Sequence, residues 1–270
     1  MKIGNKEFDT DHKTYVMGIL NVTPDSFSDG GKYNCMDLAL KHAEQMIQEG
    51  AAIIDVGGES TRPGYTKISD EEEIERTAPV VEQLKRNFDI PVSIDTYKSA
   101  VAEANAKAGA DMLNDIWGLK YDARIASVAR QYEMECCLMH NRENMEYQNF
   151  MEDMKADLRK TIRIAKEAGI ADDKIVLDPG VGFAKSYENN LEAIRRVGEL
   201  KELGYPVLLG TSKKSVIGLT LDVPSEERVV GTAVTTVFAV CQGCAFVRVH
   251  NVKENIEAIR MAEAILYGKQ

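Results

Sequence analysis

Two carboxylates and three basic side chains lie at the ends of short apolar runs, where they could take part in chemistry. Asp95 closes the run VSID and Asp178 closes IVLD, whereas Lys214, Arg248 and His250 stand in or just after the last two apolar runs. A carboxylate at the mouth of an apolar core is unfavourable unless its charge is paired. We therefore expect a ligand to supply the missing partner.

Together these side chains match a ligand with an aminopyrimidine ring at one end and a phosphate at the other. A carboxylate accepts two parallel hydrogen bonds from an N–H/NH2 edge, and Asn114 can donate and accept at a neighbouring edge. Lys214, Arg248 and His250 could seat the phosphate, to which an arginine can bind in a bidentate manner. Asn21 could ligate a Mg2+ ion held mainly by phosphate and water, because its amide oxygen is neutral.

Eight apolar runs of strand length must position these side chains. They follow a short hairpin that turns at Gly4-Asn5, and they occupy residues 15–21, 51–58, 91–96, 110–116, 135–141, 174–180, 206–212 and 245–251. Such near-continuous apolar runs are typical of strands buried on both faces in a parallel sheet. With helical segments between them and no break in composition, they predict an α/β fold, a (β/α)8 TIM barrel in which residues 1–270 form a single domain. The alternative is an open doubly wound sheet, but no GxGxxG follows the first strand.

In a TIM barrel, the carboxyl ends of the strands face the active site, and nearly every run brings a polar group to that rim. The expected rim residues are Asn21, Glu59, Asp95, Asn114, Asp115, His140, Asp178, Ser212, Lys214, Ser215, Arg248 and His250. The alternative is that they are turn formers. That alternative is weakest for Asp95, which has no Gly or Pro beside it, and stronger for Asp178, which could form an Asx-turn before Pro179-Gly180.

Two helical segments are especially clear. One covers 36–49, and the other covers 69–87 and opens with a capping box formed by Ser69 and Glu72. We interpret the acidic run 70–73 as a solvated first turn that complements the helix dipole. One face of the first helix should carry its apolar residues, Leu38, Ala39, Ala43, Met46 and Ile47.

Composition limits the partners and the compartment. The chain has 270 residues and a formal net charge of −10, which disfavours nucleic acid and anionic membranes. No apolar stretch has the length of a signal peptide core or a membrane span. The five cysteines form no disulfide framework, so we expect reduced thiols and a cytoplasmic protein. Cys241 and Cys244 have no second pair at matching spacing, which favours structural thiols over a zinc or redox site.

Five motifs, in order along essentially the whole chain, resemble the dihydropteroate synthase family. They are NVTPDSFSDGG (21–31), GGESTRPG (57–64), LDPGVGF (177–183), GTSKKSVIG (210–218) and VRVHN (247–251). The first two together are highly specific, whereas one alone would indicate only a pterin-binding barrel.

The resemblance implies roles for individual residues. The implied pterin-binding set is Asp95, Asn114, Asp178 and Lys214, with Ile116, Met139 and Phe183 lining the pocket of the ring. The implied diphosphate contacts are Thr61, Arg62, Arg248 and His250, and Asn21 is the implied Mg2+ ligand. The implied p-aminobenzoate side comprises Ser215 and the loops 23–31 and 60–64.

The resemblance also implies an SN1-like reaction. Mg2+ and the basic groups Arg62, Lys214, Arg248 and His250 would stabilise the departing diphosphate, and a pterin methylene cation would form and be attacked by the amine of p-aminobenzoate. Asp29 and the negative end of the pterin site would stabilise that cation. The family usually forms homodimers through late helices; the apolar segment 231–240 is compatible with this, and equally with a core helix.

The chain departs from the family pattern after Met139-His140, where many members have a Gly/Pro/Met-Gln loop. Here the segment Asn141–Tyr147 reads NRENMEY within a predicted long loop, and Asn251 stands where Asp is frequent. Two other functions would use the same kind of pterin-binding site. A methyltransferase barrel that passes a methyl group from methyltetrahydrofolate to a corrinoid protein would not need the basic cluster. A non-catalytic pterin-binding paralogue is the other alternative.

Overall fold

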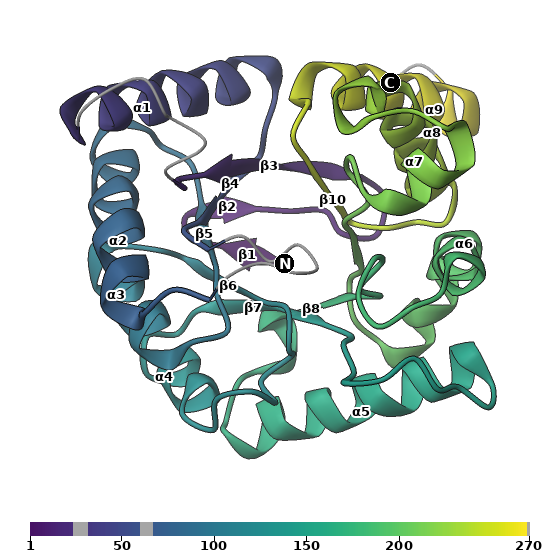
Figure 1. Ribbon diagram of the computed structural model, residues 1–270, viewed down its shortest axis with the longest axis horizontal. Helices are drawn as coiled ribbons and strands as arrows, with labels where there is room; N and C mark the ends of the chain where they lie inside the picture. Colours follow the sequence, from purple (N-terminus) through teal and green to yellow (C-terminus); the bar gives the residue numbers. More distant parts are fainter. Residues whose placement is uncertain (24–31, 60–66, 269–270) are drawn as a thin grey trace.

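The strands close into a barrel. The computed structural model describes residues 1–23, 32–59 and 67–268. Eight strands form one sheet in the order β8-β7-β6-β5-β4-β3-β10-β9, with every paired neighbour parallel. A parallel bridge between Leu177 and Val207 then joins the two edges. Figure 1 looks down on this ring, with the helices arranged around it. The predicted (β/α)8 barrel is confirmed.

The helices and strands alternate along the chain. The barrel strands are β3 (Tyr15–Asn21), β4 (Ile53–Gly57), β5 (Val92–Asp95), β6 (Met112–Asp115), β7 (Glu135–Met139), β8 (Ile175–Asp178), β9 (Leu208–Leu209) and β10 (Phe246–Val249). The helices are α1 (Lys32–Glu49), α2 (Asp70–Asn87), α3 (Ser99–Ala108), α4 (Ile125–Gln131), α5 (Phe150–Glu167), α6 (Tyr187–Arg195), α7 (Ser215–Leu221), α8 (Val229–Cys241) and α9 (Val252–Tyr267). Among the described residues, the 3-10 helices are η2 (Asp172–Lys174), η3 (Val197–Leu203) and η4 (Ser225–Glu227). Among the described residues, no helix is both long and apolar enough to cross a membrane.

The N-terminal hairpin closes the end of the barrel where the strands begin. Strands β1 (Lys2–Ile3) and β2 (Lys6–Glu7) pair antiparallel around the predicted turn, where Gly4 has φ +56°. Phe8 packs edge-on against Tyr15 at 4.9 Å between ring centroids, and it lies 5.6 Å from Phe246. In Figure 1 the amino terminus accordingly lies in the middle of the ring.

An apolar floor fills the barrel above this hairpin. It comprises Met17, Ile53, Met112, Cys137, Val176, Leu208 and Phe246, all fully buried in one cluster with Ile3 and Phe8. Residues two apart on a strand point to the same side. The side chains two positions further along therefore also point into the barrel, directly above the floor. Most of that next layer is polar: Asp55, Asn114, Asp178 and Arg248.

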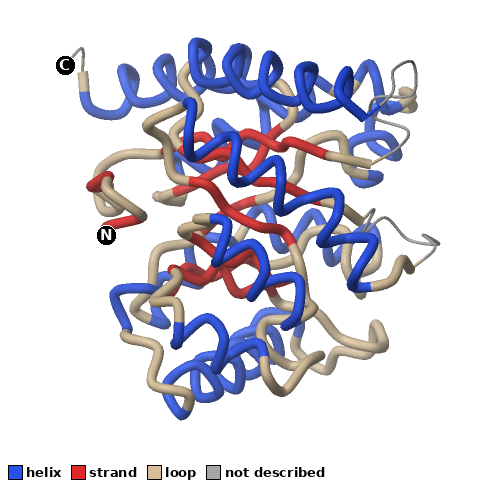
Figure 2. The backbone as a smooth tube through the Cα atoms, turned by 90° about the vertical axis from the view of Figure 1, so that its left-hand side faces the viewer, coloured by secondary structure: helices blue, strands red, loops and turns tan. Residues whose placement is uncertain are grey.

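A larger apolar core lies between the strands and the helices, which encase the sheet in the side view of Figure 2. Cys136 belongs to this outer core and Cys137 to the floor, so these neighbours on β7 point to opposite faces of the sheet. On α1, Ala39 and Ala43 are buried, but Leu38 is 40% exposed, so its predicted place on the buried face is wrong. A helix turns about 100° per residue, which carries position 38 off the arc that Ala39 and Ala43 define.

Local signals set the remaining boundaries. The Ser69 hydroxyl accepts a hydrogen bond from Glu72 N at 3.2 Å, which confirms the predicted cap of α2. The segment after β7 contains neither helix nor strand until α5 begins at Phe150, which confirms the predicted long loop. Asn149 caps α5 through its side chain.

We expect Phe8→Ala to lower the free energy of unfolding by about 3–5 kcal/mol. The substitution removes a buried ring that follows the N-terminal hairpin and leaves a cavity under the apolar floor. Urea unfolding followed by circular dichroism measures the change. Leu38→Ala is the matched control and should cost less than about 1 kcal/mol, because that side chain is already partly in solvent. Equal decreases in the free energy of unfolding of the two variants would contradict a stabilising role for the packing of Phe8.

Candidate active site

One guanidinium group holds the polar layer of the barrel together. On β10, Arg248 donates from Nε to Asp55 Oδ2 and from Nη2 to Asp95 Oδ2, both at 2.6 Å. Asn114 donates to the same Asp55 oxygen at 3.2 Å. Burial raises the pKa of Asp95 to about 7, although the charge of Arg248 opposes the shift. Burial alone would lower the pKa of Arg248, but the two carboxylates hold it above its usual range, so the guanidinium stays charged.

The other oxygen of each carboxylate lacks a partner. Asp55 Oδ1 and Asp95 Oδ1 are buried and accept no hydrogen bond from the described part of the chain. The expectation that only a ligand would compensate Asp95 is therefore wrong in part, because Arg248 pairs one of its oxygens. The free oxygens remain acceptors for which a ligand N–H is a suitable donor.

Asp55 was missed by sequence reasoning. It is fully buried and points into the barrel from the middle of β4. The available signal was a single charged residue inside the otherwise apolar run IIDVG, two positions before Gly57.

Asp178 and Lys214 converge with Arg248 around Gly210. A methyl group added at Gly210 would lie 3.5 Å from Asp178 Oδ2, 3.9 Å from Lys214 Nζ and 3.9 Å from Arg248 Cβ. The glycine thus leaves room beside three charged groups. The other oxygen of Asp178 accepts from Gly180 N at 2.6 Å, which confirms the predicted Asx-turn. Asp178 therefore shapes the turn with one oxygen and presents the second to the barrel.

Burial shifts the charge balance of this pair. It raises the pKa of Asp178 and lowers that of Lys214 to about 8, each against the effect of the other's charge. Lys214 Nζ also donates to Val181 O at 2.5 Å and lies 5.0 Å from the centre of the Phe183 ring.

Aromatic and aliphatic side chains form a wall beside the charged groups. Tyr97, Ile116 and Met139 are buried in contact with one another, and Trp117 and Phe183 pack against them. The structure therefore brings together the three predicted lining residues, Ile116, Met139 and Phe183. Tyr97 and Trp117 were missed, although each follows closely on a predicted rim residue.

Asn21 lies at the end of β3 next to Asp95. A methyl group at Gly57 would lie 3.5 Å from Asn21 Oδ1 and 3.8 Å from Asp95 Oδ2. Within residues 1–23, 32–59 and 67–268, no group of three or more His, Cys, Asp or Glu side chains could hold a metal ion. A neutral oxygen beside a carboxylate fits a cation that takes most of its ligands from phosphate and water.

The remaining predicted residues lie at the rim or outside the described chain. His250 Nδ1 is 2.9 Å from Ser212 Oγ, and Ser212 Oγ accepts from His250 N at 3.1 Å. Ser215 is exposed and begins α7. The predicted residues Asp29, Thr61 and Arg62 lie outside the described residues.

Two expected rim residues have structural roles instead. Asp115 accepts hydrogen bonds from Trp117 N at 2.8 Å and Leu119 N at 2.6 Å, so it is a turn former. His140 is fully buried, and its ring nitrogens contact Asp157 Oδ2 at 3.3 Å and Lys185 Nζ at 3.0 Å. Burial lowers the pKa of His140 to about 4, so the ring is neutral. Neither side chain faces the rim as predicted.

The acidic first turn of α2 is only partly solvated. Glu73 is 1% exposed, and Lys98 Nζ lies 2.8 Å from both Glu73 Oε2 and Glu59 Oε2. The prediction of a solvated run is therefore wrong for Glu73, because Lys98 from the neighbouring βα unit pairs with it. Glu59 Oε2 also accepts from Ile68 N at 2.9 Å, which ties together the residues on either side of 60–66.

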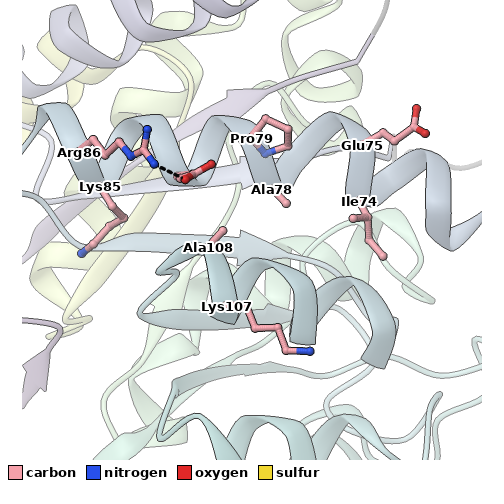
Figure 3. A pocket seen from close by; sticks show the side chains of 9 residues that line it. Ile74, Glu75, Ala78, Pro79, Lys85, Arg86, Lys107 and Ala108 are labelled. Atoms are coloured by element: carbon pink, nitrogen blue, oxygen red, sulfur yellow. Dashed lines mark hydrogen bonds and ion pairs between the residues drawn. The ribbon is translucent and has the colours of Figure 1, made fainter.

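A hollow on the outside of the barrel is separate from these groups. Figure 3 shows it between α2 and α3, lined by Ile74, Glu75, Ala78, Pro79, Glu82, Lys85, Arg86, Lys107 and Ala108. Lys85 pairs with Asp111, the residue before β6, at 2.7 Å, so the hollow lies toward the amino ends of the strands. Arg86 pairs with Glu82 at 2.6 Å. Lys107 pairs with Glu103 at 2.7 Å, and none of the rim residues described above lines the hollow.

Comparison with known proteins identifies the class. A family model described as pterin binding enzyme matches residues 17–250. The dihydropteroate synthase of Clostridium beijerinckii is 59% identical over 267 residues, 98% of this chain and 99% of that protein. A crystal structure of dihydropteroate synthase from Clostridium difficile in the presence of pteroic acid is 52% identical with a TM-score of 0.94, covering 97% of this chain and 100% of that one. The Yersinia pestis enzyme with a sulfonamide drug is 42% identical with a TM-score of 0.92, covering 98% of each chain.

A barrel with unpaired buried carboxylate oxygens above an apolar floor is thus matched by a family model over most of its length. The chain belongs to the family of pterin-binding enzymes. Within that family it groups with the dihydropteroate synthases, which are transferases.

We expect Lys98→Met to lower the free energy of unfolding by about 3–5 kcal/mol at pH 8, because it leaves Glu59 and Glu73 buried without a counter-charge. Burial already raises the pKa of Glu73, against the effect of Lys98. Without Lys98 the folded protein should hold protons that the unfolded chain releases, so the variant should regain stability as the pH falls toward 5.

Denaturant unfolding of wild type and variant at pH 8 and pH 5 measures this difference. Lys107→Met is the matched control, since Lys107 pairs with Glu103 at 2.7 Å but its side chain is 61% exposed. It should cost less than about 1 kcal/mol at either pH. A Lys98→Met loss that does not shrink at pH 5 would rule out unpaired carboxylates as the cause.

Proposed function

We propose that this barrel joins 6-hydroxymethyl-7,8-dihydropterin diphosphate to p-aminobenzoate, giving 7,8-dihydropteroate and diphosphate in folate biosynthesis. The observation that carries the proposal is the buried pair of carboxylates Asp95 and Asp178. Asp95 Oδ1 accepts no hydrogen bond from the described residues, and Asp178 Oδ2 lies beside Gly210, which has no side chain. An aminopyrimidine edge supplies the N–H donors that such oxygens accept.

The pterin ring would lie on the polar layer. Asp178 Oδ2 and Asp95 Oδ1 would accept its N–H groups, and Asn114 would bind a neighbouring edge. The buried wall of Ile116, Met139 and Phe183 supports this placement, because it offers the ring an apolar face beside the carboxylates. Lys214 would donate to a ring acceptor, and burial favours its release of a proton by lowering its pKa to about 8.

The diphosphate would leave toward the basic side of the rim. Lys214, Arg248 and His250 would act there with Thr61 and Arg62 on the departing oxygen, as the C–O bond breaks and its electron pair goes to the diphosphate. The carboxylates of the pterin site and Asp29 would stabilise the methylene cation that remains. The amine of p-aminobenzoate, bound on the side of Ser215, would then attack the cation and lose a proton.

Asn21 fits the role of a ligand for Mg2+, because its oxygen lies at the rim beside Asp95. When bound, Mg2+ would neutralise charge that develops on the departing diphosphate. Phosphate and water would supply most of the ion's other ligands.

A homodimer through the last helices would cover an exposed apolar surface. On α8, Val230, Val234 and Phe238 are 74%, 53% and 47% exposed and lie four residues apart on one face. On α9, Met261 and Ile265 are 63% and 71% exposed, and α8 packs against α9. A second copy of the chain is the partner that we propose for this surface. We also propose that the protein is cytoplasmic, because the spacing of its five cysteines forms no disulfide framework.

The test of the reaction is diphosphate release by purified protein with Mg2+ and the pterin diphosphate, with and without p-aminobenzoate. We expect release that depends on p-aminobenzoate, with dihydropteroate as the product. Tight pterin binding without turnover would instead favour a binding protein or a methyltransferase.

Arg62→Ala should greatly reduce turnover and leave pterin binding largely intact. Near wild-type turnover of Arg62→Ala would refute the role of that loop.

We expect Asp178→Ala to abolish pterin binding measured by calorimetry, because the variant lacks the charged acceptor. Asp178→Asn keeps an acceptor for Gly180 N but loses the charge. We expect it to bind the pterin about 10- to 100-fold more weakly than the wild type, the range of a lost charged hydrogen bond. Asp173→Asn, on the exposed 3-10 turn before the same strand, is the control. An unchanged affinity of the Asp178 variants for the pterin would show that the pterin-binding site lies elsewhere.

A further inference from the structure

Side-chain donors hold the loop between β8 and α6 through four of its backbone carbonyls. Lys214 donates to Val181 O at 2.5 Å, and Lys185 donates to Phe183 O at 2.9 Å. Tyr147 donates to Ala184 O at 2.8 Å, and Asn190 donates to Lys185 O at 3.3 Å. The loop thus depends on side chains rather than on a sheet or helix for its shape.

Ala184 shows that this shape has to be imposed. Its φ of +45° lies in the left-handed region that a residue with a Cβ rarely adopts. That conformation is unfavourable by about 1–2 kcal/mol and persists only where the surroundings hold it. The residue before it is Phe183, whose ring forms part of the apolar wall.

The outer support comes from the segment after β7 that departs from the family pattern. The Tyr147 ring packs edge-on against Phe150 at 4.9 Å, and the Arg142 guanidinium lies 4.4 Å from the ring centre. Arg142 in turn donates to Glu146 O at 2.6 Å and to Asp157. Burial raises the pKa of Tyr147 to about 12, so its hydroxyl remains a donor at neutral pH.

The inner support is Lys185, which is 7% exposed. Its amino group lies 3.0 Å from His140 Nδ1, and His140 Nε2 lies 3.3 Å from Asp157 Oδ2. The Asp157 carboxylate only accepts, so the neutral ring of His140 carries its proton on Nε2, and Nδ1 accepts from Lys185. Both supports therefore end on one side chain, Asp157, which binds Arg142 on one path and His140 on the other.

We propose that Tyr147 and Lys185, both anchored on Asp157, are positioning residues that hold Phe183 against the pterin ring. This inference rests on the proposed function, which puts the ring against that wall. Neither residue needs to touch the substrate, because each acts through a carbonyl of the loop. The unusual segment 141–149 thereby gains a role: it supplies the outer support.

The first test is Tyr147→Phe, which removes the hydroxyl and keeps the ring between Phe150 and Arg142. We expect the KM for the pterin diphosphate to rise about 3- to 10-fold, the range of one lost hydrogen bond. The KM for p-aminobenzoate should rise less than the KM for the pterin diphosphate, because Ser215 on its proposed side belongs to α7 and not to this loop. Lys185→Met should likewise raise the pterin KM through the inner support.

Tyr205→Phe is the matched control. Its hydroxyl donates to Asp172 at 2.5 Å on the exposed surface, so losing it should leave both KM values unchanged. A Tyr147→Phe variant with a lowered melting temperature but an unchanged pterin KM would overturn the proposal, because the hydroxyl would then serve only folding.

A double-mutant cycle with Phe183→Ala locates the effect. If the supports act through Phe183, Tyr147→Phe should add less than about twofold to the pterin KM once that ring is absent. Fully multiplicative effects would contradict positioning through Phe183. An unchanged pterin KM in Phe183→Ala alone would instead count against the proposed pterin pocket, so the two failures are distinguishable.

Discussion

The ion pairs of Arg248 with Asp55 and Asp95 are the interaction on which the site depends. Two carboxylates above an apolar floor would repel each other if no cation lay between them. The guanidinium compensates one oxygen of each and leaves the second buried and open. The resulting acceptors are fixed before any substrate arrives, so binding requires little reorganisation of charge.

The charged layer is tolerated inside the barrel because the apolar packing directly below it stabilises the fold. The hairpin and the floor bury Phe8 and Phe246, and strand periodicity then places the next inward side chains two residues higher. Glycines at 57 and 210 keep the space beside the charges open. The floor and the charged layer thus follow from the alternation of side chains along the strands.

The sequence predicted the elements better than it predicted the partners of the charged residues. Eight apolar runs and their polar ends were sufficient for the barrel and for placing Asp178 and Asn114 at the rim. Asp55 was missed because it lies inside a run and not at its end. Glu73 and His140 were misplaced for a common reason: their partners, Lys98 and Lys185, come from other βα units, and a single sequence does not show which distant charges meet.

Glu73 and His140 each belong to a buried cluster of charged and polar side chains that joins neighbouring βα units. Lys98, which follows β5, pairs with Glu59 after β4 and with Glu73 in α2. Asp157 on α5 contacts His140 after β7, and His140 contacts Lys185 after β8. A rim made only of flexible loops would need ordering at each binding event, which would weaken affinity. Buried ion pairs at the base of these loops reduce that requirement, since breaking them would leave a charge without a partner. These pairs therefore fix the residues from which the loops of the site begin.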